Sequence, residues 1–387
     1  MQLQILGYLA WFLIATSAVG CVYLLYACNA VAKFVQQPVP RAALQPAVSI
    51  LKPLRGEDPA LADNLRSFLC QDYPTLQLVC GVADASDPAA VVVRQLIGEF
   101  PHADIAFVVD PAQHGSNLKV ANLRNMLPAA KHNLLVLADS DMRVGADYLA
   151  AIIDPLATDK AVGLVTCLYR ASSAGGLWSD LASLHINHGF LPQAVVGKTL
   201  GQGAGCFGAT MALERATLAA AGGFEALADM LADDHALGQA VRRLGKRVAL
   251  SPYLVDDIVA EHSSLGLFRH ELRWARTIRL VAATGFAGSV VTYPVPLALL
   301  ALCMAAAAPL PAATMLALAL LVRAVYGRRI DRALRLKAAP LWLLPVRDLL
   351  SFGVFIASFL GRSVAWRDRR FRIGPEGQLI RVPEKLR

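Results

Sequence analysis

Charged side chains are scarce in this sequence, and the scarcity narrows the class of protein. Asp, Glu, Lys and Arg make up 17% of the 387 residues, whereas hydrophobic residues make up 56%. The mean hydropathy is +0.48. Soluble domains usually carry about 25% charged residues. The composition therefore argues against a wholly soluble protein and indicates an integral membrane protein.

Paired cysteines are absent as well. The seven cysteines include no Cys-x-x-Cys pair, so they suggest neither a zinc site nor a disulfide framework. Three of them, Cys21, Cys28 and Cys303, fall in apolar segments. We interpret the cysteines as small apolar side chains in a reducing compartment.

No Lys or Arg precedes the first long apolar run, which covers residues 3–28. A secretory signal peptide would begin with a basic stretch, so this run is better interpreted as an uncleaved membrane anchor. Lys33 and Arg41 follow the run. Because loops rich in Lys and Arg stay in the cytoplasm, we expect the middle of the chain to lie there.

The C-terminal third is apolar again, with predicted spans near 286–307 and 310–326 and a third apolar stretch at 341–361. Arg347 and Asp348 interrupt the third stretch. Three full spans would place the Arg-rich tail outside the cell, against the positive-inside rule. We therefore expect the third stretch to be re-entrant, interfacial or a short hairpin.

The basic residues lie beside the apolar segments. The net charge is +8, and Lys and Arg cluster at 323–337, expected to form a loop, and at 362–372, in the tail. A basic protein can bind nucleic acid, but clusters beside membrane spans fit the anionic cytoplasmic leaflet better. We expect the membrane as a partner and no nucleic acid.

Predicted strands and helices alternate in the middle of the chain. Strands are expected at 48–51, 76–82, 105–109 and from 134 onward, with helical stretches between them. Such a succession is typical of a mostly parallel sheet flanked by helices. The predicted fold class is therefore α/β, with transmembrane helices at the N- and C-terminal ends.

These patterns divide the chain into six parts. The predicted parts are an anchor (1–30), a linker (31–47), a cytoplasmic domain (48–265), an amphipathic interfacial helix (266–283), a membrane region (284–364) and a basic cytoplasmic tail (365–387).

Two acidic residues follow the apolar run that begins at Leu134. Asp139 and Asp141 are spaced i, i+2, which would place both carboxylates at the carboxyl edge of the sheet, where α/β sheets bind ligands. Carboxylates so close repel each other unless a cation lies between them, and Mg²⁺ combines such oxygen ligands with substrate phosphates. The same pattern also suits an N-cap or a turn, so by itself it leaves both interpretations open.

Three other features have two interpretations each. The glycine-rich segment 201–208 would bring backbone N–H groups to a sugar or phosphate, or form a tight hairpin. His185 and His188 share a helix face without an evident third metal ligand, so we interpret them as packing or acceptor-side residues. Asp234 opens a predicted helix, where the dipole stabilises any carboxylate, and Asp233 and His235 flank it.

Four features follow one another in a fixed order along the chain. They are Asp84 after a strand, Asp139-x-Asp141 after a strand, Asp234 at a helix start, and Arg273-Trp274 on a basic amphipathic helix. In this order the chain resembles the membrane-anchored GT-A glycosyltransferases, which carry D, DxD, D and (Q/R)xxRW. It is similar in particular to the ceramide glucosyltransferase family, glycosyltransferase family 21, and within it to the bacterial branch associated with hopanoid biosynthesis. The segments that carry the resemblance are 48–54, 81–88, 117–119, 139–144, 221–224 and 366–372.

The resemblance implies a GT-A nucleotide-sugar-binding domain and a role for each matching acidic residue. Asp234 would be the catalytic base. Asp139 and Asp141 would hold a divalent metal, Mg²⁺ or Mn²⁺, at the diphosphate of a UDP-sugar. Asp84 would hold the uridine, with Lys52 and Arg55 as nearby candidates.

The last motif matches in part. Arg273 would contact the diphosphate, and Trp274 would hold a lipid head group at the membrane interface. His270 stands where the family has Gln or Arg. A histidine can donate to a phosphate or hydroxyl but is usually neutral near pH 7, which leaves the role of this position open.

The implied function is a membrane-bound inverting transferase that moves a sugar from a UDP-sugar to a hydroxylated lipid acceptor. The sugar would be N-acetylglucosamine or else glucose, and the lipid a hopanoid. The implied location is the bacterial inner membrane, in a multi-pass topology with the catalytic domain facing the cytoplasm.

Three alternatives stay open: a ceramide glucosyltransferase, a processive polysaccharide synthase and an inactive lipid-binding scaffold. A processive synthase needs a polymer channel, for which the apolar segments are few. An unused cluster of carboxylates would cost stability through repulsion, which argues against the scaffold.

Overall fold

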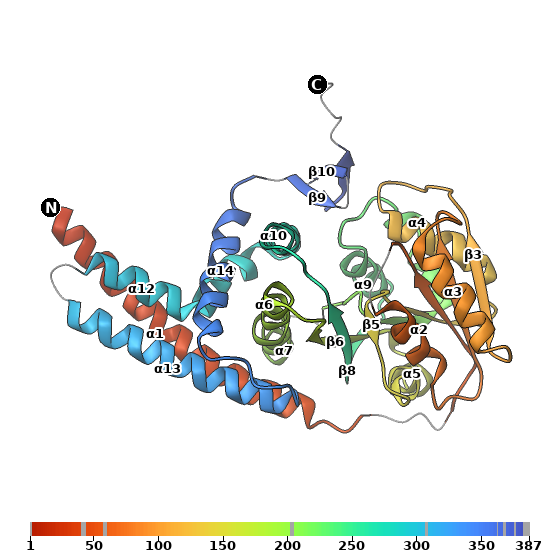
Figure 1. Ribbon diagram of the computed structural model, residues 1–387, viewed down its shortest axis with the longest axis horizontal. Coiled ribbons are helices and arrows are strands. Elements are labelled where there is room, and N and C mark those ends of the chain that lie inside the picture. Colours follow the sequence, from red (N-terminus) through yellow and green to blue (C-terminus); the bar gives the residue numbers. More distant parts are fainter. Residues whose placement is uncertain are drawn as a thin grey trace. The chain divides into compact units, whose positions relative to one another are not determined.

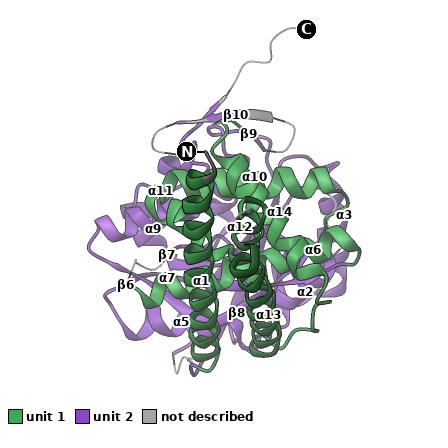
Figure 2. Ribbon diagram, turned by 90° about the vertical axis from the view of Figure 1, so that its left-hand side faces the viewer, with its two compact units in different colours: residues 1–36, 175–200, 261–368 green, residues 37–174, 201–260, 369–387 purple. Residues whose placement is uncertain are grey.

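The computed structural model describes residues 2–39, 44–56, 60–201, 205–305, 309–361, 363–366, 369–374 and 377–381. Arg41 after the anchor, residues 202–204 of the glycine-rich segment, and Arg362 and Arg367 lie outside the described residues. The chain forms two compact units, coloured separately in Figure 2. Residues 37–174, 201–260 and 369–387 are called the sheet unit, and residues 1–36, 175–200 and 261–368 the helical unit.

The sheet unit is built on an eight-stranded sheet in the order β3-β2-β1-β4-β7-β6-β8-β5. Strands β3, β2, β1 and β4 pair in parallel, as do β6 and β8, whereas β7 runs antiparallel to both of its neighbours. The mostly parallel sheet predicted from the sequence is confirmed. The strands, labelled where space allows in Figure 1, are β1 Val48–Pro53, β2 Leu76–Val82, β3 Asp104–Val109, β4 Leu134–Leu137, β5 Met142–Arg143, β6 Val162–Ser173, β7 Met211–Glu214 and β8 Arg247–Val259.

Helices cover both faces of this sheet, because successive strand residues point to opposite sides. Ile50 of β1 packs into a core with helices α2, α3 and α5, and Leu51 packs into a second core with α4, α8 and α9. Each fully buried side chain of this kind stabilises the fold by about 1.5–3 kcal/mol. The helices are α2 Leu61–Leu69, α3 Pro88–Glu99, α4 Leu118–Met126, α5 Tyr148–Thr158, α8 Arg215–Ala220 and α9 Asp233–Arg243, with short 3₁₀ turns at Leu127–Ala129 and Glu225–Leu227.

The described part of the tail also belongs to the sheet unit. Strands β10 Arg369–Ile373 and β11 Leu379–Arg381 form an antiparallel hairpin. The N–H of Leu379 donates to the carbonyl of Asp229 at 2.7 Å, and the N–H of Leu231 donates to the carbonyl of Gly377 at 3.0 Å. The hairpin is therefore bound to the segment in front of α9.

The helical unit contains two helices that are long and apolar enough to cross a bilayer, α1 Gln2–Val35 and α13 Pro309–Ala333. A further candidate span is a bent pair, in which residues 283–292 (α11 Ala283–Gly288 and η4 Ser289–Thr292) meet α12 Pro294–Met304 at 68°. Helices α12 and α13 pack against α1, as Figure 1 shows. The predicted transmembrane helices near both ends are confirmed.

The predicted third apolar stretch forms α14 Leu343–Ser358, which has 16 residues. At 1.5 Å per residue, such a helix is about 24 Å long, shorter than the roughly 30 Å hydrocarbon core of a bilayer. Helix α13 continues to Ala333, so part of the predicted basic loop is helical. Arg323 in particular is buried inside the unit.

Two further helices of this unit carry residues that the sequence analysis singled out. Residues 177–199 form one helix whose middle is a π-helical turn, η2 Ile186–Phe190, between α6 Leu177–His185 and α7 Leu191–Thr199. Helix α10 Ser264–Val281 is the predicted amphipathic helix. Strand β9 covers Ser363–Trp366.

Candidate active site

The candidate site lies at the carboxyl edge of the parallel strands. Lys52 is the penultimate residue of strand β1, and Asp139 follows β4 by two residues. The ammonium of Lys52 donates to the carbonyl oxygen of Asp139 and lies 3.9 Å from the ring centroid of Phe68. Lys52 is fully buried. Its side chain therefore supports the turn that carries Asp139 from within the core and does not point to solvent.

Asn117 joins two segments at this edge. Its side-chain oxygen accepts from the N–H groups of Lys119 at 3.0 Å and Val120 at 3.1 Å, which caps α4. Its amide group donates to the carbonyl of Met230 at 2.8 Å and to Asp233 at 3.3 Å. Because Asn117 is fully buried, these bonds hold the start of α4 against the start of α9.

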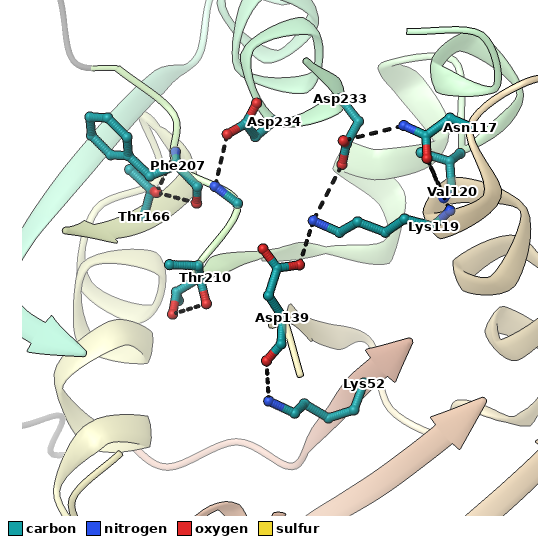
Figure 3. A network of polar contacts seen from close by, with 12 residues as sticks. Lys52, Asn117, Lys119, Val120, Asp139, Thr166, Phe207, Thr210, Asp233 and Asp234 are labelled. Carbon is teal, nitrogen blue, oxygen red and sulfur yellow. Dashed lines mark hydrogen bonds and ion pairs between the residues drawn. The ribbon is translucent and has the colours of Figure 1, made fainter. Parts of the chain in front are cut away.

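Lys119 lies between the carboxylates that arrive from β4 and α9, as Figure 3 shows. Its Nζ is 2.6 Å from Oδ1 of Asp139 and 3.6 Å from Oδ2 of Asp233. Burial alone would lower the pKa of Lys119, but Asp139, Asp233 and Asp234 outweigh burial and raise this pKa. The site therefore contains a permanent positive charge among its carboxylates.

Asp234 is held in place by two backbone groups. The N–H of Gly208 donates to Oδ2 at 2.9 Å, and the N–H of His235 donates to Oδ1 at 2.7 Å. Burial, followed by the charge of Asp233, raises the pKa of Asp234 to about 6, although Lys119 and both N–H groups oppose the rise. A carboxylate with such a pKa is mostly ionised at pH 7 yet basic enough to accept a proton.

Gly208 leaves open the space where these charges meet. A Cβ atom added at Gly208 would lie 3.3 Å from Nζ of Lys119, 3.4 Å from Oδ2 of Asp139 and 3.5 Å from Oδ2 of Asp234. Neighbouring Phe207 is fixed by Thr166, whose hydroxyl accepts from the N–H of Phe207 at 2.9 Å. The glycine-rich segment therefore reaches the site, and its Gly208 N–H binds the carboxylate of Asp234.

The carboxylates that follow β4 are suitable ligands for a hard divalent cation. Asp139 and Asp141 follow β4, both are partly buried, and the carbonyl of Asp141 accepts from Ile258 at 3.1 Å. Within the described ranges, no three Asp, Glu, His or Cys side chains are grouped closely enough to hold a metal by themselves. Mg²⁺ typically binds one or two carboxylates together with phosphate oxygens, so Asp139 and Asp141 fit an ion that shares its ligands with a diphosphate.

Asp84 lies beyond the end of β2 and is exposed. Its carboxylate accepts from the N–H and the hydroxyl of Ser86, both at 2.8 Å, and these hydrogen bonds lower its pKa. Asp87 caps α3 and also accepts from the N–H of Gly56. Asp87 thus joins the segment after β2 to the segment after β1 that carries exposed Arg55.

The other predicted residues, Arg273, Trp274 and His270, lie on α10 in the helical unit. Nδ1 of His270 is 2.8 Å from Oε1 of Glu261. The rings of His270 and Trp274 meet edge to face, with centroids 4.6 Å apart. On its other side, Trp274 lies 6.4 Å from the ring of His185. The residue that replaces Gln or Arg is therefore paired with a carboxylate inside this unit.

The sequence analysis gave no role to Asn117 or Lys119, which the structure brings to the site. Gly208 was expected, as part of the glycine-rich segment, either to bring a backbone N–H to a sugar or phosphate or to lie in a hairpin, and in the structure its N–H donates to Asp234. Asn117 and Lys119 were part of the resemblance, and an asparagine in front of a helix is a typical N-cap. That signal locates the start of α4, but the contacts with Asp233 depend on segments more than 100 residues apart.

Known proteins resemble this chain in sequence and in fold. The sequence model of glycosyl transferase family 21 matches residues 12–379. The chain is 25% identical over 231 residues to Ceramide glucosyltransferase 1 of Caenorhabditis elegans, covering 60% of this chain and 49% of that protein. It is 33% identical over 113 residues to the ceramide glucosyltransferase of Komagataella phaffii, covering 28% of this chain and 22% of that protein. The chain thus spans about half or less of the length of these curated relatives.

A solved structure shares the architecture. The mannosyltransferase PcManGT from Pyrobaculum calidifontis, determined in complex with GDP-Man and Mn²⁺, superposes with a TM-score of 0.58 at 20% sequence identity. The match covers 91% of this chain and 99% of that one. This likeness confirms the GT-A fold predicted from the sequence.

Proposed function

Because the chain belongs to glycosyl transferase family 21, we propose that it is a membrane-bound glycosyltransferase that moves a sugar from a UDP-sugar to a hydroxylated lipid, with inversion at the anomeric carbon. The observation that carries the proposal is the meeting of Lys119, Asp139 and Asp234 around Gly208. This meeting lies at the carboxyl edge of the parallel strands, where α/β sheets bind nucleotides. The names of the ceramide glucosyltransferase relatives support a lipid acceptor.

In this proposal the chain keeps the division expected from its sequence. Residues 48–265 form the catalytic domain on the cytoplasmic side of a bacterial inner membrane, and 266–283 lie along the membrane surface. The anchor 1–30 and the region 284–364 hold the protein in the bilayer. Residues 31–47 link the anchor to the catalytic domain, and the basic tail 365–387 remains cytoplasmic.

Asp234 acts as the base in the transfer step. The acceptor hydroxyl gives its proton to the Asp234 carboxylate as its oxygen attacks the anomeric carbon of the donor sugar. On the opposite face, the bond from that carbon to the diphosphate oxygen breaks, and UDP leaves with the electron pair. Hydrogen bonds from Gly208 and His235 hold Asp234 in one orientation for this step.

The donor is held by charges of both signs. Asp139 and Asp141 would hold a divalent cation, Mg²⁺ or Mn²⁺, which when bound neutralises charge on the departing diphosphate. Lys119 lies beside Asp139 and adds a fixed positive charge to the same place. Asp84 would hold the uridine, and buried Lys52 keeps Asp139 in position from below.

Helix α10 supplies the remaining groups. Arg273 would contact the diphosphate, and Trp274 would hold the lipid head group at the membrane interface. His270, paired with Glu261, would fix the orientation of Trp274.

The proposed sugar is N-acetylglucosamine, or else glucose, and the proposed acceptor is a hopanoid. A second candidate acceptor is ceramide, favoured by the names of the curated relatives. Both lipids offer a hydroxyl group at the membrane surface, so the same base and donor site serve either reaction.

The test is to incubate membranes that contain the full chain with labelled UDP-glucose, UDP-N-acetylglucosamine and other UDP-sugars. Bacteriohopanetetrol and ceramide serve as acceptors, with and without Mn²⁺ or Mg²⁺, and labelled lipids are identified by mass. We expect one glycolipid, formed only with metal, and about 10²–10⁴-fold less of it from membranes containing Asp234→Asn. A ladder of long polysaccharide chains, or UDP-sugar binding without transfer to any lipid, would refute the proposal.

A further inference from the structure

The helical unit contains a polar cavity that the proposed transfer step does not use. Its volume is ≈ 40 Å³, which leaves room for about three water-sized groups. Its walls come from the helix 177–199 and from α1, α13 and α14, together with Thr292 and Tyr293 in front of α12. Two of the walls, α1 and α13, are candidate membrane spans, so a ligand of this cavity would come from the bilayer.

The charged groups around the cavity are paired with each other. Nε of Arg323 is 2.9 Å from both carboxylate oxygens of Asp348. Nε2 of His188 is 2.7 Å from Asp331, and Nδ1 of His188 is 3.3 Å from Arg323. The side chains of Arg323, Asp348 and His188 are 5%, 13% and 1% exposed. Each of the two arginines that line the cavity is paired with a carboxylate, Arg323 with Asp348 and Arg347 with Glu271, so the cavity suits a neutral polar group better than a phosphate or an amine.

Polar side chains of the cavity remain available to a ligand, among them His185 and Gln193. Neither of these two side chains makes a hydrogen bond to any described residue. Burial lowers the pKa of His185, so its ring is neutral at pH 7 and has one donor and one acceptor nitrogen. The amide of Gln193 likewise both donates and accepts. Hydroxyl and amide groups are the natural partners for such a pair.

The helix that carries His185 and Gln193 changes from α-helical to π-helical geometry beside the cavity. The π-helical turn 186–190 lies between His185 and Gln193, and π-turns occur frequently at functional sites. The hydroxyl of Tyr326 donates to the carbonyl of His188 at 2.7 Å, which stabilises the turn. Gly189 in the same turn lines the cavity, and a Cβ added there would lie 3.7 Å from Nδ1 of His185.

We propose that this cavity binds the polar end of the acceptor lipid, with His185 and Gln193 hydrogen-bonded to hydroxyl or amide groups that are not glycosylated. The inference rests on the proposed function, because it names the part of that substrate which the cavity recognises. A lipid with several neighbouring polar groups fits, since one hydroxyl reacts and the others remain to identify the molecule. A lipid with a single hydroxyl, such as a simple sterol or fatty alcohol, has nothing left to bind here.

The test measures lipid binding and transfer separately on the purified full chain in detergent micelles. Binding of tritiated bacteriohopanetetrol and tritiated C6-ceramide is measured at equilibrium without UDP-sugar, and UDP binding is measured without lipid. The variants are His185→Leu, Gln193→Leu and Gly189→Leu, which fills the cavity while keeping both polar side chains. The matched control is Ser183→Ala, a buried residue of the same helix whose hydroxyl makes no hydrogen bond.

We expect each of the three variants to weaken binding of the accepted lipid, and to raise its KM, at least tenfold, while UDP binding and donor KM stay at wild-type values. Ser183→Ala should change neither. Wild-type lipid binding in variants that keep the wild-type melting temperature would overturn the cavity assignment. A wild-type protein that binds lipid through this cavity but transfers no sugar would instead refute the proposed function, so the two failures are distinguishable.

Discussion

At the scale of single residues, the separation of Asp234 from the donor carboxylates gives the sharpest prediction. Asp234→Asn removes the proposed base but keeps the size and polarity of the side chain. We expect transfer to fall about 10²–10⁴-fold, the usual contribution of a general base, while UDP-sugar binding stays near wild type. Transfer is measured with the identified acceptor, and binding by equilibrium dialysis of labelled donor.

Two further variants serve as comparisons for Asp234→Asn. Asp141→Ala should weaken metal-dependent donor binding as well as transfer, because it removes a proposed metal ligand. Asp147→Asn alters an exposed carboxylate of the same unit and should change neither property. Near wild-type turnover of Asp234→Asn would remove Asp234 as the base.

The pKa of about 6 for Asp234 also predicts how the rate depends on pH. A base must be ionised to accept a proton, so kcat/KM for the acceptor should rise as pH increases through about 6 and level off above it. A pH profile measured between pH 4.5 and 8.5 checks this. A rate that is flat across pH 6, with the acceptor well below saturation, would contradict the assignment.

The raised pKa of Asp234 also affects the stability of the folded protein, which should decrease, whereas the rate should increase, as pH rises through about 6. Burial raises the folded-state pKa of Asp234 above the unfolded value of about 3.9, so the folded state favours the protonated form. Its stabilising contribution is present below pH 4 and is lost as pH rises through about 6. Asn resembles the protonated form, so at pH 7 Asp234→Asn should melt at or above the wild-type temperature, which separates lost chemistry from lost folding.

The sequence predicts where the acidic side chains lie better than it predicts what surrounds the lysine side chains of the site. An apolar run followed by acidic residues has few structural solutions, so Asp84 and Asp139 were expected beyond the strand ends where they lie. Lys52 was expected to face a nucleotide, but it is buried beneath Asp139. Lys119 was given no role, because its contact with Asp233 depends on the approach of two distant segments. Local pattern specifies an element and its ends, whereas such contacts depend on tertiary packing.

At the scale of elements, the N-cap of α4 has two separable effects. Asn117→Ala removes both the cap, at a cost of about 1 kcal/mol, and the bonds to Met230 and Asp233. Asn117→Ser keeps a capping oxygen but is too short to hold the 230–233 segment. We expect transfer to fall about tenfold in both variants, and the melting temperature to fall mainly in Asn117→Ala. Wild-type transfer by Asn117→Ser would show that these bonds do not position the site.

A buried ion pair connects α10 with α14. Nη1 and Nη2 of Arg347 lie 2.7 and 2.6 Å from the carboxylate oxygens of Glu271, and both residues are almost fully buried. Arg347→Met leaves an uncompensated buried carboxylate, which should cost about 3–5 kcal/mol, whereas Arg347→Met with Glu271→Leu should recover most of that loss. This double-mutant cycle is measured by the melting temperatures, in detergent, of the wild type, the two single variants and the double variant.

The matched control for this cycle is an exposed pair. Arg66 lies 2.8 Å from Glu99, and both side chains are more than one-third exposed. Exposed pairs contribute little, so Arg66→Met should leave the melting temperature almost unchanged. If Arg347→Met were equally harmless, the buried pair would not hold α10 against α14.

Several elements escaped the sequence analysis for identifiable reasons. Strand β5 has only two residues, and β8 carries Pro252, Asp256 and Asp257 within its length, so neither gives an apolar strand signal. The short antiparallel strand β7 lies between two parallel groups, and no local pattern specifies that insertion. The π-helical turn at 186–190 contains as many apolar residues as an ordinary helix, so the hydrophobic periodicity of the sequence does not reveal it.

At the scale of the whole molecule, the hydrogen bonds of the tail restrict the C-terminal region to an even number of membrane crossings. The tail hairpin is bonded to Asp229 and Leu231 of the sheet unit, so residues 229 and 379 lie on one side of the bilayer. The chain between them must therefore cross an even number of times. By length and composition, the bent pair 283–304 and α13 are candidates for two crossings, and α14, with 16 residues, is too short for a third.

Whether the number of crossings is even can be tested by labelling single cysteines with a membrane-impermeant maleimide. The background is Cys70→Ser/Cys303→Ser, which removes the exposed cysteines of the described residues. Ile380 in β11 is 51% exposed, and Leu310 at the start of α13 is 76% exposed. We expect Ile380→Cys to be labelled in inverted vesicles and protected in intact spheroplasts, and Leu310→Cys to show the reverse. The basic residues at the end of α13 and in the tail then both face the cytoplasm, as the positive-inside rule requires. Labelling of Ile380→Cys from outside would mean that α14 crosses the bilayer, and that the tail cannot be bound to the sheet unit.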